Sequence, residues 1–261
     1  MSSDLTQFSA VIPRRRRSWM QTGIWLIALA LLSPLAASFV LCPSMSILAT
    51  HQPAETRFML YRERQAARDG RAFALRYSPV RLADLPRYLP KMAIAAEDAN
   101  FRTHRGFDLD AIEKALRANR KRGKVVRGGS TITQQLAKNL WLSPKRSWLR
   151  KGLEAVLAAR LELALDKDRI LELYLNVIEF GDGVFGIEAA ARHYYGVGAA
   201  SLSPTQAAML IASIPQPLKY NPKRPSARME RVSARLLRET GLAPKPEVEE
   251  PEPEDEDEGF I

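Results

Sequence analysis

The feature that most constrains this 261-residue sequence is an apolar stretch near its amino terminus. Residues Gly23 to Leu41 are almost continuously apolar, and no charged residue occurs from Ser18 to Thr50. A helix needs ~20 apolar residues to cross a bilayer core, so this stretch is long enough to span one. Arg14 to Arg17 precede it, and a basic flank of this kind stays on the cytoplasmic side. The rest of the chain is therefore expected outside the cytoplasmic membrane.

A cleaved secretory signal peptide is the alternative interpretation of the same stretch. Residues 35–38 (Leu-Ala-Ala-Ser) offer a small-residue cleavage site. The apolar core of a signal peptide is normally shorter, however, at ~7–15 residues. We therefore expect one retained transmembrane helix. The expected segments are a cytoplasmic basic segment over 1–18, the transmembrane helix over 19–42, a membrane-proximal stem over 43–76, a folded domain over 77–243 and an acidic, disordered tail over 244–261.

Apolar periodicity predicts that the folded domain is mainly α-helical. Leu149, Leu153, Leu157 and Leu161, for example, recur at intervals close to the helical period. No series of alternating strands is evident, and only residues 76–80 have the pattern of a short extended piece. Helices are expected over 91–98, 109–122, 131–142, 148–165, 166–175, 187–195, 204–214 and 227–240.

The charge of the chain indicates an anionic partner. The formal net charge is +10, although residues 244–261 contain nine acids and only one lysine. The remainder is therefore more basic still, which favours nucleic acid, an acidic membrane surface or a phosphorylated substrate. An external domain tethered to a membrane makes nucleic acid an unsuitable partner. Anionic lipid or a lipid-linked diphosphate fits the same charge better.

Glu97 is the first candidate catalytic residue. It ends an alanine-rich, apolar helix, and Asp98 follows it. The negative end of the helix dipole and apolar neighbours both raise the pKa of such a carboxyl. A carboxylate with a raised pKa is suited to accept a proton from a sugar hydroxyl. The alternative is an ordinary polar helix terminus, because Glu-Asp pairs are common.

A second group lies in Gly128–Asn139, which reads GGSTITQQLAKN. Two glycines before a helix amino terminus leave backbone N–H groups free for an anion. Lys138 adds a point charge on the same helix. Thr131 and Gln134 have the spacing of a capping box, which needs no ligand. Capping does not account for Gln135, Lys138 and Asn139 together.

A third group combines cations with a carboxylate. Arg150 and Lys151 precede Glu154 by four and three residues, so the three side chains can share one helix face, and Arg146 lies just before them. A surface salt bridge, contributing at most ~1 kcal/mol, is one interpretation. The other is a carboxylate among cations that contact a diphosphate, directly or through a divalent metal.

Two further patterns are read as structural. Gly181–Gly186 matches G-x-G-x-x-G, but no βαβ unit surrounds it, so a tight, closely packed turn is expected rather than a dinucleotide site. His104 and His193 are isolated, with no metal-ligand spacing around them.

Together these groups resemble the peptidoglycan glycosyltransferases of glycosyltransferase family 51. The resemblance lies in four ordered motifs, EDANFRTHRGFD (97–108), GGSTITQQLAKN (128–139), RKGLE (150–154) and KDRILELYLN (167–176), and it extends from about residue 77 to 221. EFGDGVFGIEAAARHYYG (179–196) is most similar to the monofunctional biosynthetic transglycosylase branch. Val197 departs from the family, which usually has Lys there. The S-x-x-K and K-T-G motifs of a transpeptidase do not occur, so no transpeptidase activity is expected.

The resemblance implies a function and a role for each motif residue. The enzyme would polymerise lipid II into β-1,4-linked glycan strands with inversion and release undecaprenyl diphosphate. Glu97 would be the general base and Glu154 a second catalytic carboxylate that orients cations or binds Mg²⁺ or Mn²⁺; no organic cofactor is implied. The residues expected to bind substrate are Ser130, Thr131, Gln134, Gln135, Lys138, Asn139, Arg146, Arg150 and Lys151.

The resemblance also implies a lysozyme-like, mainly α glycosyltransferase domain with a membrane-proximal jaw lobe, part of which would be Leu109–Arg127. The expected location is the bacterial inner membrane, single-pass, with a cytoplasmic amino terminus and a periplasmic catalytic domain. Expected partners are lipid II, the growing glycan chain, anionic lipids and other cell-wall synthesis proteins, but not nucleic acid. A lysozyme-type hydrolase and a catalytically silent scaffold remain the alternatives.

Overall fold

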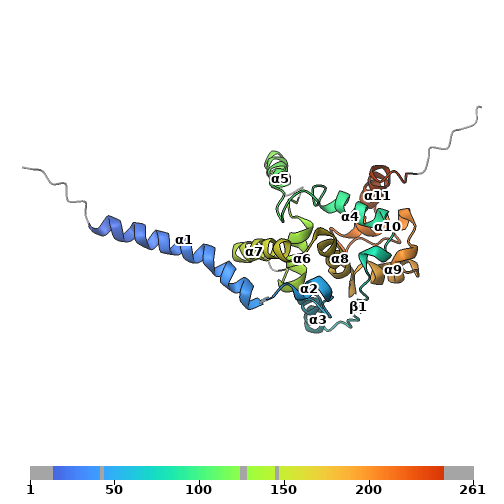
Figure 1. Cartoon of the computed structure of the whole chain (residues 1–261). Coiled ribbons are helices and arrows are strands. Elements are labelled where there is room, and N and C mark those ends of the chain that lie inside the picture. The colour runs from blue at the N-terminus through green and yellow to red at the C-terminus, as the bar shows by residue number, and fades with distance from the viewer. Residues whose placement is uncertain (1–13, 42–43, 124–127, 145–146, 244–261) are drawn as a thin grey trace, which may run out of the picture.

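The computed structural model describes residues 14–41, 44–123, 128–144 and 147–243, and this part of the chain is mainly helical (Figure 1). Arg146 and residues 244–261 lie outside it. The helices are α1 Arg14–Leu41, α2 Ile47–Thr50, α3 Arg57–Arg68, α4 Tyr88–Glu97, α5 Leu109–Arg122, α6 Ile132–Trp141, α7 Trp148–Ala164, α8 Lys167–Val177, α9 Ile187–Tyr195, α10 Pro204–Ser213 and α11 Ala227–Glu239, with 3-10 turns η1 Leu82–Asp84 and η2 Ala199–Ser201.

Side-chain caps fix the helix ends that the sequence predicts. Thr131 accepts a hydrogen bond from the backbone N–H of Gln134, whose side chain bonds back, which completes the expected capping box. Asp108 and Asp166 cap α5 and α8 by accepting a hydrogen bond from the backbone N–H of Ala111 and Arg169, respectively. Gly123 ends α5 in the left-handed conformation at φ 62°. The capping pattern therefore sets where these helices begin and end.

The core is built around α6, which lies among α3, α7 and α8 (Figure 1). Its apolar residues Ile132, Leu136 and Leu140 are buried. A second layer packs α10 against α4 and α11. These two layers meet at the carboxyl end of α4 and the amino end of α6, so the core holds the first two sequence motifs next to each other.

A small sheet joins distant parts of the chain, and the sequence predicts only the extended residues of its first strand. Its strands β1 Arg76–Tyr77, β2 Glu179–Gly181 and β3 Val184–Phe185 have the order β1-β3-β2, with β1 parallel and β2 antiparallel to β3. The turn holds Gly183 at φ 70°, and a Cβ there would lie 2.4 Å from the Ala74 carbonyl oxygen. The glycine-rich match is thus a close-packed turn, as expected.

The segment expected as a membrane-proximal stem packs onto the domain. Met45 and Leu48 are buried in the main core, and Phe58 and Met59 pack with Phe185. Arg62 on α3 pairs with the buried Glu179 at 2.7 Å. Within the described residues, this segment is therefore continuous with the core.

Helix α1 extends away from the body on one side (Figure 1). Its carboxyl-terminal part contacts α7, where the guanidinium of Arg160 lies 3.9 Å from the ring centre of Phe39. Among the described residues, no helix is both long enough and apolar enough to cross a membrane. The transmembrane helix expected over 19–42 is therefore not confirmed and stays a prediction.

Helix α5 stands apart from the other helices (Figure 1). Ala115 is its one buried residue, while Leu109 and Leu116 are exposed. The jaw lobe expected to include Leu109–Arg127 stays a prediction, and residues 124–127 lie outside the described chain.

Candidate active site

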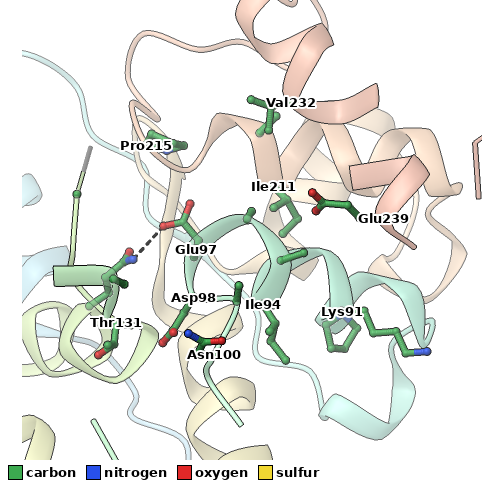
Figure 2. Close-up of a pocket in the computed structure, with 18 of the residues that line it drawn as sticks. Lys91, Ile94, Glu97, Asp98, Asn100, Thr131, Ile211, Pro215, Val232 and Glu239 are labelled. Atoms are coloured by element: carbon green, nitrogen blue, oxygen red, sulfur yellow. Dashed lines mark hydrogen bonds between the residues drawn. The ribbon is translucent and has the colours of Figure 1, made fainter. Parts of the chain in front are cut away.

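A cleft of about 1610 Å³ opens beside the end of α4. The carboxyl end of α4, the Gly128–Thr131 loop, the end of α10 and one face of α11 form its walls (Figure 2). Of the residues expected to act on substrate, Glu97, Ser130, Thr131 and Gln135 line it. The cleft therefore joins the first two sequence motifs.

Glu97 is the last residue of α4 and is partly buried at the cleft wall. Burial raises the pKa of its carboxyl, and the neighbouring Asp98 raises it further. The Nε2 amide of Gln135 donates to Glu97 Oε2 at 2.9 Å, the dashed line in Figure 2, and with the charge of Lys138 it lowers the pKa in part. The net result is a carboxyl group with a raised pKa that faces the cleft.

The side chain of Gln135 is fixed by its own partners. Tyr174 is fully buried and its hydroxyl donates to Gln135 Oε1 at 3.4 Å. Burial holds the pKa of Tyr174 well above its usual value, so the hydroxyl keeps its proton and remains a donor. Because Oε1 accepts from Tyr174, the amide N–H₂ of Gln135 is left to face Glu97.

Lys138 lies on α6, where the charges of two carboxylates act on its ammonium. Burial lowers the pKa of its ammonium, and the charges of Glu154 and Glu97 oppose that shift. Arg150 and Lys151 lower it further. One cation is thus coupled both to the cleft carboxylate and to the cluster around Glu154.

Glu154 is buried among cations on α7. Arg150 Nη1 donates to one carboxylate oxygen at 3.0 Å, and Lys151 Nζ pairs with the other. Lys151 also donates to Ser130 Oγ at 3.1 Å, which links the cluster to the cleft wall. The buried Nε of Arg150 has no hydrogen-bond partner within the described structure. Within the described residues, the cluster therefore holds one buried donor without an acceptor.

The surroundings of Glu154 do not match a resident divalent metal. Both of its oxygens are taken by cations. Across the residues described here, no group of three or more His, Cys, Asp or Glu side chains is placed to hold a metal ion. The donor set fits an anion rather than Mg²⁺ or Mn²⁺.

Asp98 ties the end of α4 to the start of α6. Its buried carboxylate accepts from the backbone N–H of Ile132 at 2.9 Å and contacts His104 Nε2 at 2.9 Å. Thr131 Oγ1 donates to the Gly106 carbonyl at 2.7 Å and adds a second tie. His104 is structural, as expected, whereas the positioning role of Asp98 was not predicted from the sequence.

Two of the expected substrate-binding residues lie in the interior. Gln134 Oε1 accepts from the backbone N–H of Thr131, and Asn139 Nδ2 donates to the Gln135 carbonyl at 2.8 Å. Both side chains are buried, and neither lines the cleft. The structure thus gives them helix-stabilising contacts.

The cleft also contains cations that sequence reasoning missed. They lie on α4 or just before it, after α4, on α5 and on α11, and comprise Arg87, Lys91, Arg102, Lys114, Arg228, Arg231 and Arg235. The spacing of Arg228, Arg231 and Arg235 places them on one helix face, which is a signal that the sequence does contain.

This geometry can accept a proton and stabilise a separate negative charge. A carboxyl with a raised pKa lies in an open cleft, and a cation cluster with a spare donor lies behind the Ser130 wall. General-base catalysis needs the first element, and departure of an anionic leaving group needs the second.

The chain is similar to known transglycosylases. The family model described as Transglycosylase matches residues 66–240. A biosynthetic peptidoglycan transglycosylase of Herminiimonas arsenicoxydans is 44% identical over 222 residues, covering 85% of this chain and 96% of the relative. One from Neisseria meningitidis serogroup C (strain 053442) is 49% identical over 195 residues, covering 75% and 84%. One from Neisseria gonorrhoeae is 48% identical over the same length.

Proposed function

This chain belongs to the transglycosylase family and is a peptidoglycan glycosyltransferase, and from that premise we propose that it polymerises lipid II into β-1,4-linked glycan strands. The observation that carries the proposal is that Glu97 and Ser130 line one cleft, and that Lys151 joins Ser130 to the cation cluster around Glu154. A carboxylate base and a cation cluster joined in this way suit a reaction that removes a proton and expels a diphosphate.

Glu97 acts as the general base in this proposal. It takes the proton from the 4-hydroxyl of the acceptor sugar while that oxygen forms a bond to C1 of the donor sugar. The bond from C1 to the diphosphate oxygen breaks on the opposite face, so the configuration at C1 inverts. The raised pKa of Glu97 makes its carboxylate a stronger base than an exposed glutamate.

The cations stabilise the leaving diphosphate. Lys138, Arg150 and Lys151 supply positive charge, and the unpartnered Nε of Arg150 supplies a donor for a phosphate oxygen. Glu154 holds Arg150 and Lys151 in place, which is the positioning role proposed for it. No step in this scheme passes through a protein-bound metal, and transfer of glycosyl groups is the single activity proposed.

We also propose that α1 anchors the enzyme in the bacterial inner membrane, with Arg14–Arg17 cytoplasmic and the domain periplasmic. Support comes from the apolar sequence of α1 and from exposed apolar side chains on the helix that it contacts. Trp148 and Leu149 at the start of α7 are 94% and 65% exposed, beside the proposed diphosphate site. A lipid-linked substrate would reach the cations from that side.

A polymerisation assay tests the function. Purified full-length protein in detergent, incubated with lipid II, is expected to yield glycan polymer, whereas Glu97→Gln is expected to lose about 10²–10⁴-fold in rate. Addition of a chelator, and separately of Mg²⁺ or Mn²⁺, reports any metal requirement. Release of sugars from preformed cell wall without polymer formation would identify a hydrolase. Full cellular function of Glu97→Gln would identify a scaffold.

A further inference from the structure

One wall of the cleft carries a row of cations that the proposed reaction does not use. Arg228, Arg231 and Arg235 line the cleft from α11, and Arg87 and Lys91 line it from the start of α4. The three arginines are spaced three and four residues apart, which places them on one face of the helix. The row is therefore a feature of the wall rather than scattered surface charge.

The charges in this row are largely uncompensated. Arg228 and Arg231 are exposed, and within the described part of the chain no carboxylate lies within 4.0 Å of either of them, or of Arg87 or Lys91. Arg235 faces Glu239 at 3.8 Å, with both side chains about half exposed. Because ion pairs among the described residues do not account for Arg228 and Arg231, these two carry the argument.

We propose that this row binds the carboxylates of the peptide attached to the sugar substrate. The inference rests on the proposed function, because the row lines the same continuous cleft as Glu97. A group that binds there is therefore part of the molecule that reaches the base, and a substrate of peptidoglycan synthesis carries a peptide next to its sugars.

The spacing and the surroundings of the row fit an extended peptide. Arg231 and Arg235 are separated by about 6 Å along the helix. Carboxylates two residues apart in an extended peptide lie on the same side of it and are separated by about 7 Å. Apolar side chains of Val232, Ile211 and Pro215 lie in the same wall (Figure 2). Alternating cations and apolar surface match a peptide with alkyl side chains and carboxylates.

A lipid headgroup fits this position less well. Helix α11 lies on the far side of the domain from the outward end of α1 (Figure 1). A bilayer that contains α1 would therefore lie away from the arginine row. The diphosphate cluster of Arg150 and Lys151 is a separate set of cations on α7.

The chain itself offers a competing source of carboxylates. Residues 244–261 contain nine acids and are separated from the end of α11 by four residues. Tethering gives such a segment a high effective concentration near the row. The experiment must therefore separate carboxylates of the substrate from those of the tail.

Equilibrium binding of a soluble disaccharide-peptide without lipid tests the proposal. The full-length chain is titrated with the free-acid peptide form and with the form whose carboxylates are amidated. Arg228→Gln/Arg231→Gln is expected to weaken binding of the acid form about three- to tenfold, in line with two exposed ion pairs. The amidated form is expected to bind both proteins equally weakly. Arg238→Gln, an exposed α11 cation outside the cleft lining, is the matched control and should bind like the wild type.

Because binding needs no turnover, this result is independent of whether polymer forms. Equal binding of the acid form by the double variant and the wild type would overturn the proposal, and so would an equal loss for both ligand forms. The same titrations are repeated with the full-length chain whose tail acids are changed to Gln or Asn. Persistence of the arginine effect supports the peptide. Its disappearance would assign the row to the tail and overturn the proposal.

Discussion

Glu97 shows how a single residue combines function with a cost in stability. Its folded-state pKa lies above the value for an exposed glutamate, so the folded protein binds this proton more tightly than the unfolded chain does. The folded state therefore loses stability as pH rises from the unfolded pKa through the folded one, and above that window the charged carboxylate is a net burden. The charged form of this proposed base thus lowers the free energy of unfolding at high pH.

Replacement of the proposed base by its neutral isostere should therefore stabilise the fold while lowering the rate about 10²–10⁴-fold. We expect the melting temperature of Glu97→Gln to exceed that of the wild type at pH 8. At pH 4, where both side chains are neutral, we expect a smaller difference between the two melting temperatures. Thermal unfolding followed by circular dichroism at the two pH values measures this. A lower melting temperature for the variant at pH 8 would mean that the charged carboxylate stabilises the fold.

Gln135 lowers the pKa of Glu97 through one hydrogen bond. That bond favours the charged carboxylate, so Gln135→Leu should raise the pKa of Glu97 and move the acidic limb of the kcat/KM profile to higher pH. The pH dependence of polymerisation provides the readout. Tyr174→Phe is a milder companion change, because it removes only the donor that orients Gln135, and it should shift the limb less. A limb that does not move in Gln135→Leu would show that the bond is absent in solution.

Lys138 should matter to transfer more than to folding. Its ammonium is largely buried and its charge is disfavoured by burial, so Lys138→Met should keep the fold and lower kcat by about 10²–10³-fold, the usual loss on removing one stabilising charge. Denaturant unfolding and single-turnover polymerisation separate the two effects. The same change should weaken inhibition by phosphoglycolipids that resemble the donor, and unchanged inhibition would argue against phosphate contact at this residue.

At the scale of elements, helices were the predictable part. Apolar period and caps place α5, α6 and α9 within about a residue of their observed ends, because a cap such as Asp108 or Thr131 is local in sequence. The strands could not be predicted in this way, since β1 and β3 are two residues each and pair across more than a hundred residues. The place of α11 in the cleft wall could not be predicted for the same reason. Helix α11 reaches that wall by packing against α10 and against α4, and α4 is distant from it in sequence.

The tie between α4 and α6 gives an element-scale prediction. Asp98→Ala leaves the Ile132 N–H and His104 without their partner, and it should cost about 1–3 kcal/mol in the free energy of unfolding. Asp98→Asn keeps one acceptor and should cost less. Urea unfolding of both variants measures the difference, and equal stability of Asp98→Ala and wild type would show that the tie contributes nothing.

At the scale of the whole molecule, the proposed membrane anchor adjoins a helix with exposed apolar side chains. Helix α1 leaves the body next to α7, whose first residues expose Trp148 and Leu149, and α5 exposes further leucines. We expect protease added outside spheroplasts to digest the domain while sparing a fragment with Arg14–Arg17. Digestion of that fragment in intact spheroplasts would contradict a cytoplasmic amino terminus.

The placement of Lys138 has a consequence for inhibition. Any negatively charged compound that settles beside this lysine offsets its field at Glu97, so the carboxyl gains affinity for its proton even though the compound never touches it. A compound that occupied only the proposed diphosphate site would in this way also weaken Glu97 as a base. A substitution of Lys138 that prevented inhibition would also remove the positive charge that acts on Glu97. We therefore expect resistant variants at this position to lose activity.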